Sequence, residues 1–179
     1  MRITKVYTRT GDDGTTALAK GERLLKDSPR IAAFGALDEL SAGLGVALAE
    51  ELHDEISDIL DAVQHVLFNI GGELAIPGEV LDLVKSQDVK KLESAINSLN
   101  SSLPPLKEFI LSRGSKSVVL LHQARAVCRR AERVLVTLNK QEEVNPIDLQ
   151  YINRLSDYLF VAARYQNEID GGTEELWKK

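Results

Sequence analysis

Residues 8–16 form a segment rich in groups that bind phosphate. Gly11 and Gly14 carry no side chain, so the backbone amides beside them can approach a ligand closely. Hydroxyl and cationic side chains lie around them: Thr8, Arg9, Thr10, Thr15, Thr16, Lys20, Arg23 and Lys26. This donor set suits a polyphosphate. Neither a Walker loop nor a dinucleotide glycine pattern is present, so an ordinary glycine-rich hairpin or tail is the alternative.

Two adjacent carboxylates in this segment, Asp12 and Asp13, are candidates for holding a magnesium ion through water. Mg²⁺ in proteins usually keeps part of its hydration shell and binds one or two carboxylates together with substrate phosphates. The three histidines, His53, His65 and His122, show no metal-ligand spacing and are expected at the surface or at the edge of the core. The sequence therefore leaves the metal ligands unassigned.

A second cationic group lies between residues 125 and 133. Arg125, Arg129, Glu132 and Arg133 are separated by four, seven and eight residues, which places them on one side of a helix. Arginine forks match phosphate oxygens, so three arginines with one acid indicate an anion site. A salt-bridge network between helices or between subunits is the alternative.

Polar residues on two other segments complete the candidate set. Asn153 and Asp157 lie four residues apart with Arg154 beside them, which predicts either a ligand contact by Asn153 or, as the favoured interpretation, buried structural polar pairs. Asp38 is flanked by apolar positions. It is therefore expected to be a partly buried acid that needs a cationic partner.

The elements that position these residues are predicted to be helices. Aromatic residues make up only 5% of the chain, whereas the helix-forming Ala, Leu, Glu and Lys are plentiful. Capping residues and breakers place five helices at about 28–49, 54–70, 86–99, 115–139 and 145–170. Ser28 and Ser86 are the expected caps of the first and third, and Gly71-Gly72 the expected end of the second. Short links between long helices favour an antiparallel bundle.

The fourth helix has the clearest apolar pattern, with alternating spacings of four and three. Its predicted core stripe comprises Leu120, Ala124, Val127, Ala131, Val134 and Leu138. Cys128 lies beside this stripe and is expected to be a small core residue. By its local pattern Phe109 is also expected in the core, and Trp177 is either a packing anchor or part of a disordered tail.

Length and charge limit the classes of protein. The chain has 179 residues, a length suited to one domain, and its net charge of −5 argues against a general nucleic-acid binder. No apolar run is expected to reach the ~18–20 residues of a membrane span. A single cysteine excludes an internal disulfide and a cysteine metal cluster, which fits the cytoplasm.

Four blocks of residues, taken together, resemble the PduO-type corrinoid adenosyltransferases, or ATP:cob(I)alamin adenosyltransferases. The blocks are Thr-Arg-Thr-Gly-Asp at 8–12, Asp-Glu-Leu at 38–40, Cys-Arg-Arg-Ala-Glu-Arg at 128–133 and Asn-Arg-Leu-Ser-Asp-Tyr-Leu-Phe at 153–160. The resemblance covers nearly the whole chain. It implies one domain, with an ATP-binding loop at 1–27, a helical bundle at 28–172 and a tail at 173–179.

The resemblance also implies an activity and an assembly. The protein would transfer the 5′-deoxyadenosyl group from ATP to cob(I)alamin, releasing triphosphate, with Mg²⁺ as cofactor. It would form a homotrimer with active sites between subunits. A reductase and an adenosylcobalamin-dependent acceptor enzyme would be its protein partners, neither of them identified by the sequence. The alternatives are a non-catalytic trimeric protein for cobalamin delivery or sensing, and a structural helical bundle.

Site roles follow from the same resemblance, position by position. The loop residues expected at the ATP phosphates are Thr8, Arg9, Thr10, Gly11, Thr16 and Lys26. The nucleotide contacts expected from the fourth and fifth helices are Arg129, Arg130, Glu132, Arg133 and Asn153. Asp38 would pair with Arg125 of the neighbouring subunit, and Phe109 would pack against the lower face of the corrinoid. Relatives often have a proline after this phenylalanine, which Phe-Ile-Leu-Ser-Arg-Gly at 109–114 lacks.

Overall fold

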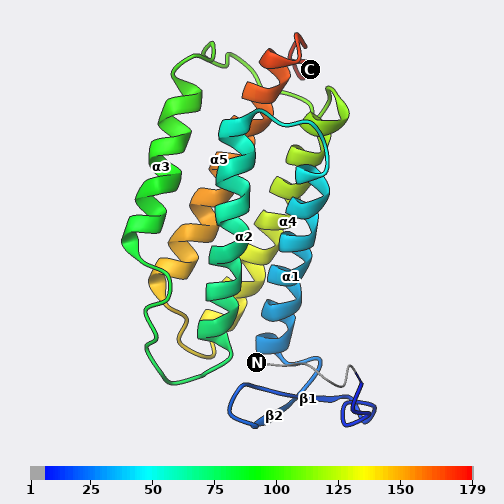
Figure 1. The fold of residues 1–179 in the computed structure, drawn as a ribbon, viewed down its shortest axis with the longest axis vertical. Coiled ribbons are helices and arrows are strands. Elements are labelled where there is room, and N and C mark those ends of the chain that lie inside the picture. Colours follow the sequence, from blue (N-terminus) through cyan, green and yellow to red (C-terminus); the bar gives the residue numbers. More distant parts are fainter. Residues whose placement is uncertain (1–6, 179) are drawn as a thin grey trace.

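The computed structural model describes residues 7–178, and helices dominate this part of the chain. Its five helices are α1 (Pro29–Leu48), α2 (Asp54–Leu74), α3 (Ser86–Asn100), α4 (Lys116–Asn139) and α5 (Pro146–Ile169). Successive helices run in opposite directions (Figure 1). Helix α4 packs against both α1 and α5, while α2 packs on α1 and α3 on α5. The predicted five-helix antiparallel bundle is confirmed.

The start of α5 has the cap expected at residue 145, and α4 begins after a serine cap, whereas the caps expected for α1 and α3 are not found. The Ser115 hydroxyl accepts from the Val118 amide at 3.4 Å, and the Asn145 side chain accepts from the Ile147 amide at 3.0 Å. Ser28 precedes α1 but makes no capping hydrogen bond, so that prediction is wrong. In α3 the cap is one residue earlier than Ser86, because the carboxylate of Asp88 accepts from the preceding amide, that of Lys85.

The second helix does not end at Gly71-Gly72 as predicted but continues to Leu74. Leu74 is buried in the core, and its carbonyl accepts a hydrogen bond of 2.6 Å from the Arg30 guanidinium. A β-carbon on Gly72 would lie 3.1 Å from the Leu83 side chain, so the missing side chain lets the following loop pack closely. Tertiary packing here outweighs the ~1 kcal/mol that a glycine costs in a helix.

The amino-terminal segment contains a small hairpin, which is the alternative that the glycine pattern left open. Strands β1 (Thr15–Ala17) and β2 (Arg23–Leu25) pair antiparallel, with Thr15 opposite Leu25. The hairpin lies at the end of the bundle where α1 begins (Figure 1). The Ala19 amide donates to the Ala75 carbonyl at 3.3 Å and ties the hairpin to the end of α2.

The buried face of α4 is wider than the predicted stripe and its centre is shifted by one residue. Leu121, Cys128 and Leu135 are fully buried, whereas Leu120, Val127 and Val134 pack only at the edge of the core; the other predicted members, Ala124, Ala131 and Leu138, are buried. The shift arises because α4 contacts α1 on one side and α5 on the other. Cys128 is the core residue that was predicted.

Helix α1 is long and apolar enough, by length and composition alone, to cross a membrane. The expectation that no apolar run reaches this length is therefore wrong for this segment. In the bundle, one side of α1 faces the core, where Leu40, Leu44 and Ala47 are fully buried. No other helix among residues 7–178 is long and apolar enough to cross a membrane.

Candidate active site

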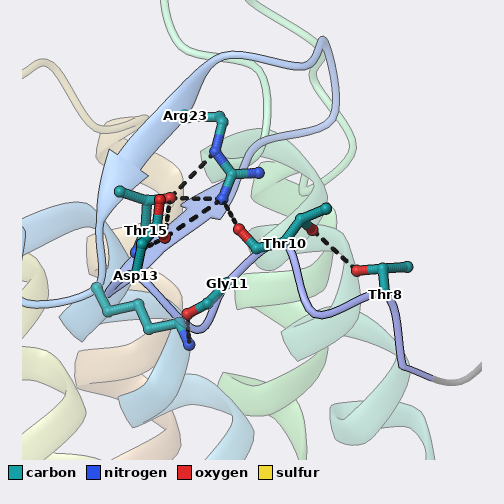
Figure 2. Close-up of polar contacts among 7 residues, drawn as sticks. Thr8, Thr10, Gly11, Asp13, Thr15 and Arg23 are labelled. Atoms are coloured by element: carbon teal, nitrogen blue, oxygen red, sulfur yellow. Dashed lines mark hydrogen bonds and ion pairs between the residues drawn. The ribbon is translucent and has the colours of Figure 1, made fainter.

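A network of side chains folds the segment before β1 into a compact turn (Figure 2). The Arg23 guanidinium donates to the Thr15 hydroxyl, with Nε at 3.1 Å, and to the Thr10 carbonyl. The Asp13 carboxylate accepts from the Thr15 amide at 3.0 Å and from its hydroxyl at 2.7 Å. The hydroxyls of Thr8 and Thr10 lie 2.8 Å apart. The turn thus holds its donors and carbonyls in a defined arrangement before any ligand binds.

Lys26, the residue directly after β2, is bonded to this turn through two of its groups. Its ammonium donates to the Gly11 carbonyl at 2.8 Å, and its backbone amide donates to the Gly14 carbonyl at 2.9 Å. A β-carbon on Gly11 would lie 3.1 Å from the Thr15 carbonyl oxygen, so a side chain there would crowd the turn. The structure therefore brings Thr8, Thr10, Gly11 and Lys26 of the predicted phosphate contacts into one turn. Of the other two, Arg9 places its guanidinium 5.7 Å from the centre of the Tyr7 ring, and Thr16 lies in β1 opposite Leu24.

The two loop carboxylates fit a magnesium ion only as partial ligands. Hydrogen bonds from the hydroxyl and the amide of Thr15 lower the pKa of Asp13, which therefore stays ionised at neutral pH. Among residues 7–178 there is no group of three or more His, Cys, Asp or Glu side chains that could hold a metal ion. Asp12 and Asp13 with phosphate oxygens are the kind of donor set that Mg²⁺ accepts.

The arginine side chains of α4 make contacts in two different places. Arg129 and Arg133 are exposed, and Arg133 donates to the Arg129 carbonyl at 3.0 Å. Glu132, on the same side, accepts from the Asn153 amide group of α5 at 2.7 Å. Arg130 instead forms an ion pair with Glu39 of α1. Arg130 is thus separated from the other predicted nucleotide contacts within the chain.

The polar residues of α5 form the predicted pairs, but they are not buried. Arg154 bonds Asp157 at 3.0 Å and Glu93 of α3 at 3.1 Å, and both Asn153 and Asp157 are exposed. The predicted burial is wrong because this side of α5 lies beside α4 at the surface rather than in the centre of the bundle. Asn153 is consequently accessible to a ligand while its amide is held by Glu132.

A cavity of about 560 Å³ lies where the connection between α3 and α4 meets the bundle. Its walls include Phe109, Ile110, His122, Arg125 and Phe160. Phe109 is 78% exposed, so the expectation from its local pattern that it belongs to the core is wrong. The connection runs across the end of the bundle (Figure 1).

Arg125 lies against an aromatic ring in this cavity. Its guanidinium carbon is 5.2 Å from the centre of the Phe160 ring, a cation–π distance, and the His122 ring is 6.4 Å from the same ring. Burial, and then the neighbouring Arg125, lower the pKa of His122, so the imidazole is neutral at pH 7. Within residues 7–178 no carboxylate lies within 4 Å of the Arg125 guanidinium.

Sequence reasoning did not assign Phe160 and His122 to this cavity. Only their spacing could have indicated this assignment: Phe160 lies seven residues after Asn153, and His122 lies three residues before Arg125. On a helix, these spacings put Phe160 on the same side as Asn153 and His122 on the same side as Arg125.

Asp38 is exposed in the single chain, contrary to the expectation of a partly buried acid. It lies at a second cavity of about 500 Å³ between α1 and α2, whose walls include Phe34, Leu37, Leu67 and Phe68. No ion pair joins Asp38 to Arg125 among the described residues. The structure therefore does not bring these two predicted partners together within one chain.

Comparison with known proteins identifies the class to which this bundle and loop belong. The model of the cobalamin adenosyltransferase family matches residues 6–166. The chain belongs to this family, so the family predicted from the four sequence blocks is confirmed.

Individual relatives match over almost the whole chain. A protein of Cupriavidus metallidurans named cobalamin adenosyltransferase is 46% identical over 179 residues, covering 99% of this chain and 96% of that protein. The corrinoid adenosyltransferase of Bacillus subtilis is 46% identical and covers 93% and 89%. Among solved structures, a variant PduO-type ATP:corrinoid adenosyltransferase from Lactobacillus reuteri, complexed with cobalamin and ATP, superposes with a TM-score of 0.92. It is 35% identical and covers 98% of this chain and all of that one.

Proposed function

We propose that this protein transfers the 5′-deoxyadenosyl group from ATP to cob(I)alamin, producing adenosylcobalamin and triphosphate. The cobalt(I) electron pair forms the bond to the ribose C5′ carbon, and the C5′–oxygen bond breaks as triphosphate leaves. The observation that carries this proposal is the membership of the family, together with the cationic residues present in the loop and on α4. Cobalt(I) is itself a strong nucleophile, so the protein needs no general base.

The loop and the α4 arginines are proposed to bind the triphosphate. Arg129 and Arg133 would stabilise the charge that develops on the leaving group, since donors positioned in advance act most strongly there. The Lys26 ammonium donates to the Gly11 carbonyl, which a phosphate oxygen can replace. A magnesium ion between Asp12, Asp13 and the phosphates would supply further positive charge.

The remaining nucleotide contacts are proposed for the loop, α4 and α5. They are Thr8, Arg9, Thr10, Gly11 and Thr16 at the phosphates, with Arg130, Glu132 and Asn153 at the rest of the nucleotide. The hydrogen bond from Asn153 to Glu132 supports a positioning role, because it fixes the amide before the ribose arrives. Arg130 would have to exchange its pairing with Glu39 for this contact.

Phe109 is proposed to face the lower side of the corrinoid ring. Its exposed ring at the cavity offers an apolar surface that excludes water from the lower axial position of the cobalt. A vacant lower position makes reduction of cobalt(II) easier, so Phe109 would act on substrate that enters as cob(II)alamin. A reductase would supply the electron, and an adenosylcobalamin-dependent enzyme would accept the product.

A homotrimer with sites between subunits is proposed because one face of the chain remains apolar. On this face Phe68 of α2 is 76% exposed and lines the same cavity as Asp38. Burying a phenylalanine stabilises an interface by about 1.5–3 kcal/mol. A second copy on this face would also provide Arg125 with the carboxylate of Asp38 that its own chain does not place near it. The cytoplasm is the proposed compartment, since the single cysteine is buried and unpaired by any disulfide.

An anaerobic assay with ATP and cob(I)alamin tests the function. We expect the spectrum of adenosylcobalamin to appear together with stoichiometric triphosphate, and neither to appear when ATP is omitted. Binding of ATP and cobalamin without a cobalt–carbon bond would identify a delivery or sensing protein instead.

A further inference from the structure

The C-terminal segment, residues 173–178, lies against the connection that forms one wall of the Phe109 cavity. Leu176 and Ile110 form an antiparallel bridge. The Leu111 amide donates to the Glu175 carbonyl at 2.8 Å, and the Trp177 amide donates to the Phe109 carbonyl at 2.7 Å. In the described chain, these are the backbone hydrogen bonds that join residues 104–112 to another part of the fold. The main chain of the cavity wall is therefore held by the C-terminal segment.

One buried side chain of α5 holds both of these segments. Arg164 is only 5% exposed, and its Nε donates to the Glu174 carboxylate at 2.5 Å. Its Nη2 donates to the Pro104 carbonyl, at the start of the connection, at 2.8 Å. A buried guanidinium is stable only while its charge and its donors are paired. Loss of the Glu174 carboxylate would therefore release the C-terminal segment and leave a buried charge behind.

We propose that Arg164 and Glu174 are positioning residues for the corrinoid cavity. Their ion pair docks the C-terminal segment, the docked segment holds the main chain at residues 109–111, and the held main chain sets the place of the Phe109 ring. The role rests on the proposed function, since it assigns the cavity to the corrinoid. Neither residue lines that cavity, so each acts through the wall and not by touching substrate.

The opposite end of the bundle offers a matched control. Arg30 of α1 is 4% exposed, its Nε donates to the Glu142 carboxylate at 2.8 Å, and its Nη1 donates to the Leu74 carbonyl at 2.6 Å. This is the same chemistry as at Arg164, at the end where α1 begins and far from the cavity wall (Figure 1). Glu142→Gln therefore reproduces the loss of a buried arginine's partner without disturbing the wall.

Trp177 allows docking of the C-terminal segment to be measured without any substrate. It is the single tryptophan of the chain and is 44% exposed, so its fluorescence reports whether the segment is docked. In the full-length protein we expect Glu174→Gln to increase acrylamide quenching of Trp177 and to shift its emission to longer wavelength. Glu142→Gln should leave both as in the wild type.

Steady-state kinetics then test whether docking of the C-terminal segment affects the corrinoid cavity. For Glu174→Gln we expect the KM for the corrinoid to rise about 10-fold, the size expected for one hydrogen bond to a charged group, with the KM for ATP unchanged. Glu142→Gln should change neither KM. Unchanged quenching in Glu174→Gln would overturn the docking role. Changed quenching with an unchanged corrinoid KM, or equal KM changes in both variants, would overturn the positioning role.

Failure of the proposed function and failure of the positioning role give different experimental results. A wild-type protein that forms no cobalt–carbon bond would overturn the proposed function and with it the assignment of the cavity. In that case the difference in quenching between Glu174→Gln and Glu142→Gln would still appear, because it needs no substrate.

Discussion

Asp148 is a buried carboxyl group whose titration should control the stability of the fold. It is the third residue of α5 and is 0% exposed, and neither of its carboxylate oxygens accepts a hydrogen bond from any described residue. Burial, and then the nearby carboxylate of Glu73, raise the pKa of Asp148 from 3.8 to about 7. Glu73 gives no compensation, since its own oxygens accept from the Leu83 amide and the Asn145 side chain.

The sign of the effect follows from this raised pKa. The unfolded chain loses the Asp148 proton at a lower pH than the folded chain, so the stability that this group contributes is greatest below pH ~4 and is lost as the pH rises through about 7. At about 1.4 kcal/mol for each pH unit of difference, the free energy of unfolding falls by about 3 kcal/mol between pH 5 and pH 8 from this group alone. Asp148→Asn cannot titrate and should escape that loss.

Urea unfolding of the wild type and Asp148→Asn, at one protein concentration, measures the difference. We expect the variant to gain about 3 kcal/mol relative to the wild type between pH 5 and pH 8. Asp88→Asn is the matched control, since Asp88 is the third residue of α3 but is half-buried and accepts from the Lys85 amide at 3.1 Å. A difference between Asp148→Asn and the wild type that is the same at both pH values would refute the reasoning.

Four further variants or treatments test the site and the core. Arg129→Ala should lower kcat about 10–100-fold by removing one charged hydrogen bond to the leaving group, and an unchanged kcat at saturating ATP would exclude that role. Phe109→Ala should impair turnover from cob(II)alamin while ATP affinity, measured by titration, stays the same; equal losses would make the ring merely structural. Asp38→Asn should weaken the proposed trimer or corrinoid binding, seen by sedimentation and spectral titration, because it would remove the proposed partner of Arg125 in the neighbouring subunit. Cys128 is fully buried and its pKa is raised to about 12, chiefly by burial, so the native protein should resist iodoacetamide at pH 8 and react once unfolded.

Local residue patterns were sufficient for the helices because their determinants lie within a few residues of one another. Ser115 before α4, and Asn145 with Pro146 at α5, bond or shape the first turn of their own helix. The same holds for the shared side of Arg125, Arg129 and Glu132, since residues four and seven apart are neighbours on any helix. The family could be identified because its motifs are short, contiguous and in a fixed order.

Contacts between distant segments were decided by the tertiary structure. Gly71-Gly72 stays helical because the bundle buries Leu74 beyond it, which no local propensity could indicate. Arg130 turns to Glu39 of α1 and away from its own neighbours on α4 because α1 and α4 are packed together. The pairing of Ile110 with Leu176 depends on where two irregular segments meet. Irregular segments have no periodic sequence pattern from which such a pairing could be predicted.

By itself, then, the sequence determined five helical segments, the glycine- and threonine-rich loop and the family motifs, since each depends on neighbours along the chain. Only the tertiary structure decided that Phe109 is exposed on a wall held by the C-terminal segment, and that Asp38 and Arg125 of one chain lie apart. The physical reason is the range of the interactions: hydrogen bonds within a helix join residues that are close in sequence, whereas burial and ion pairing depend on which helices become neighbours.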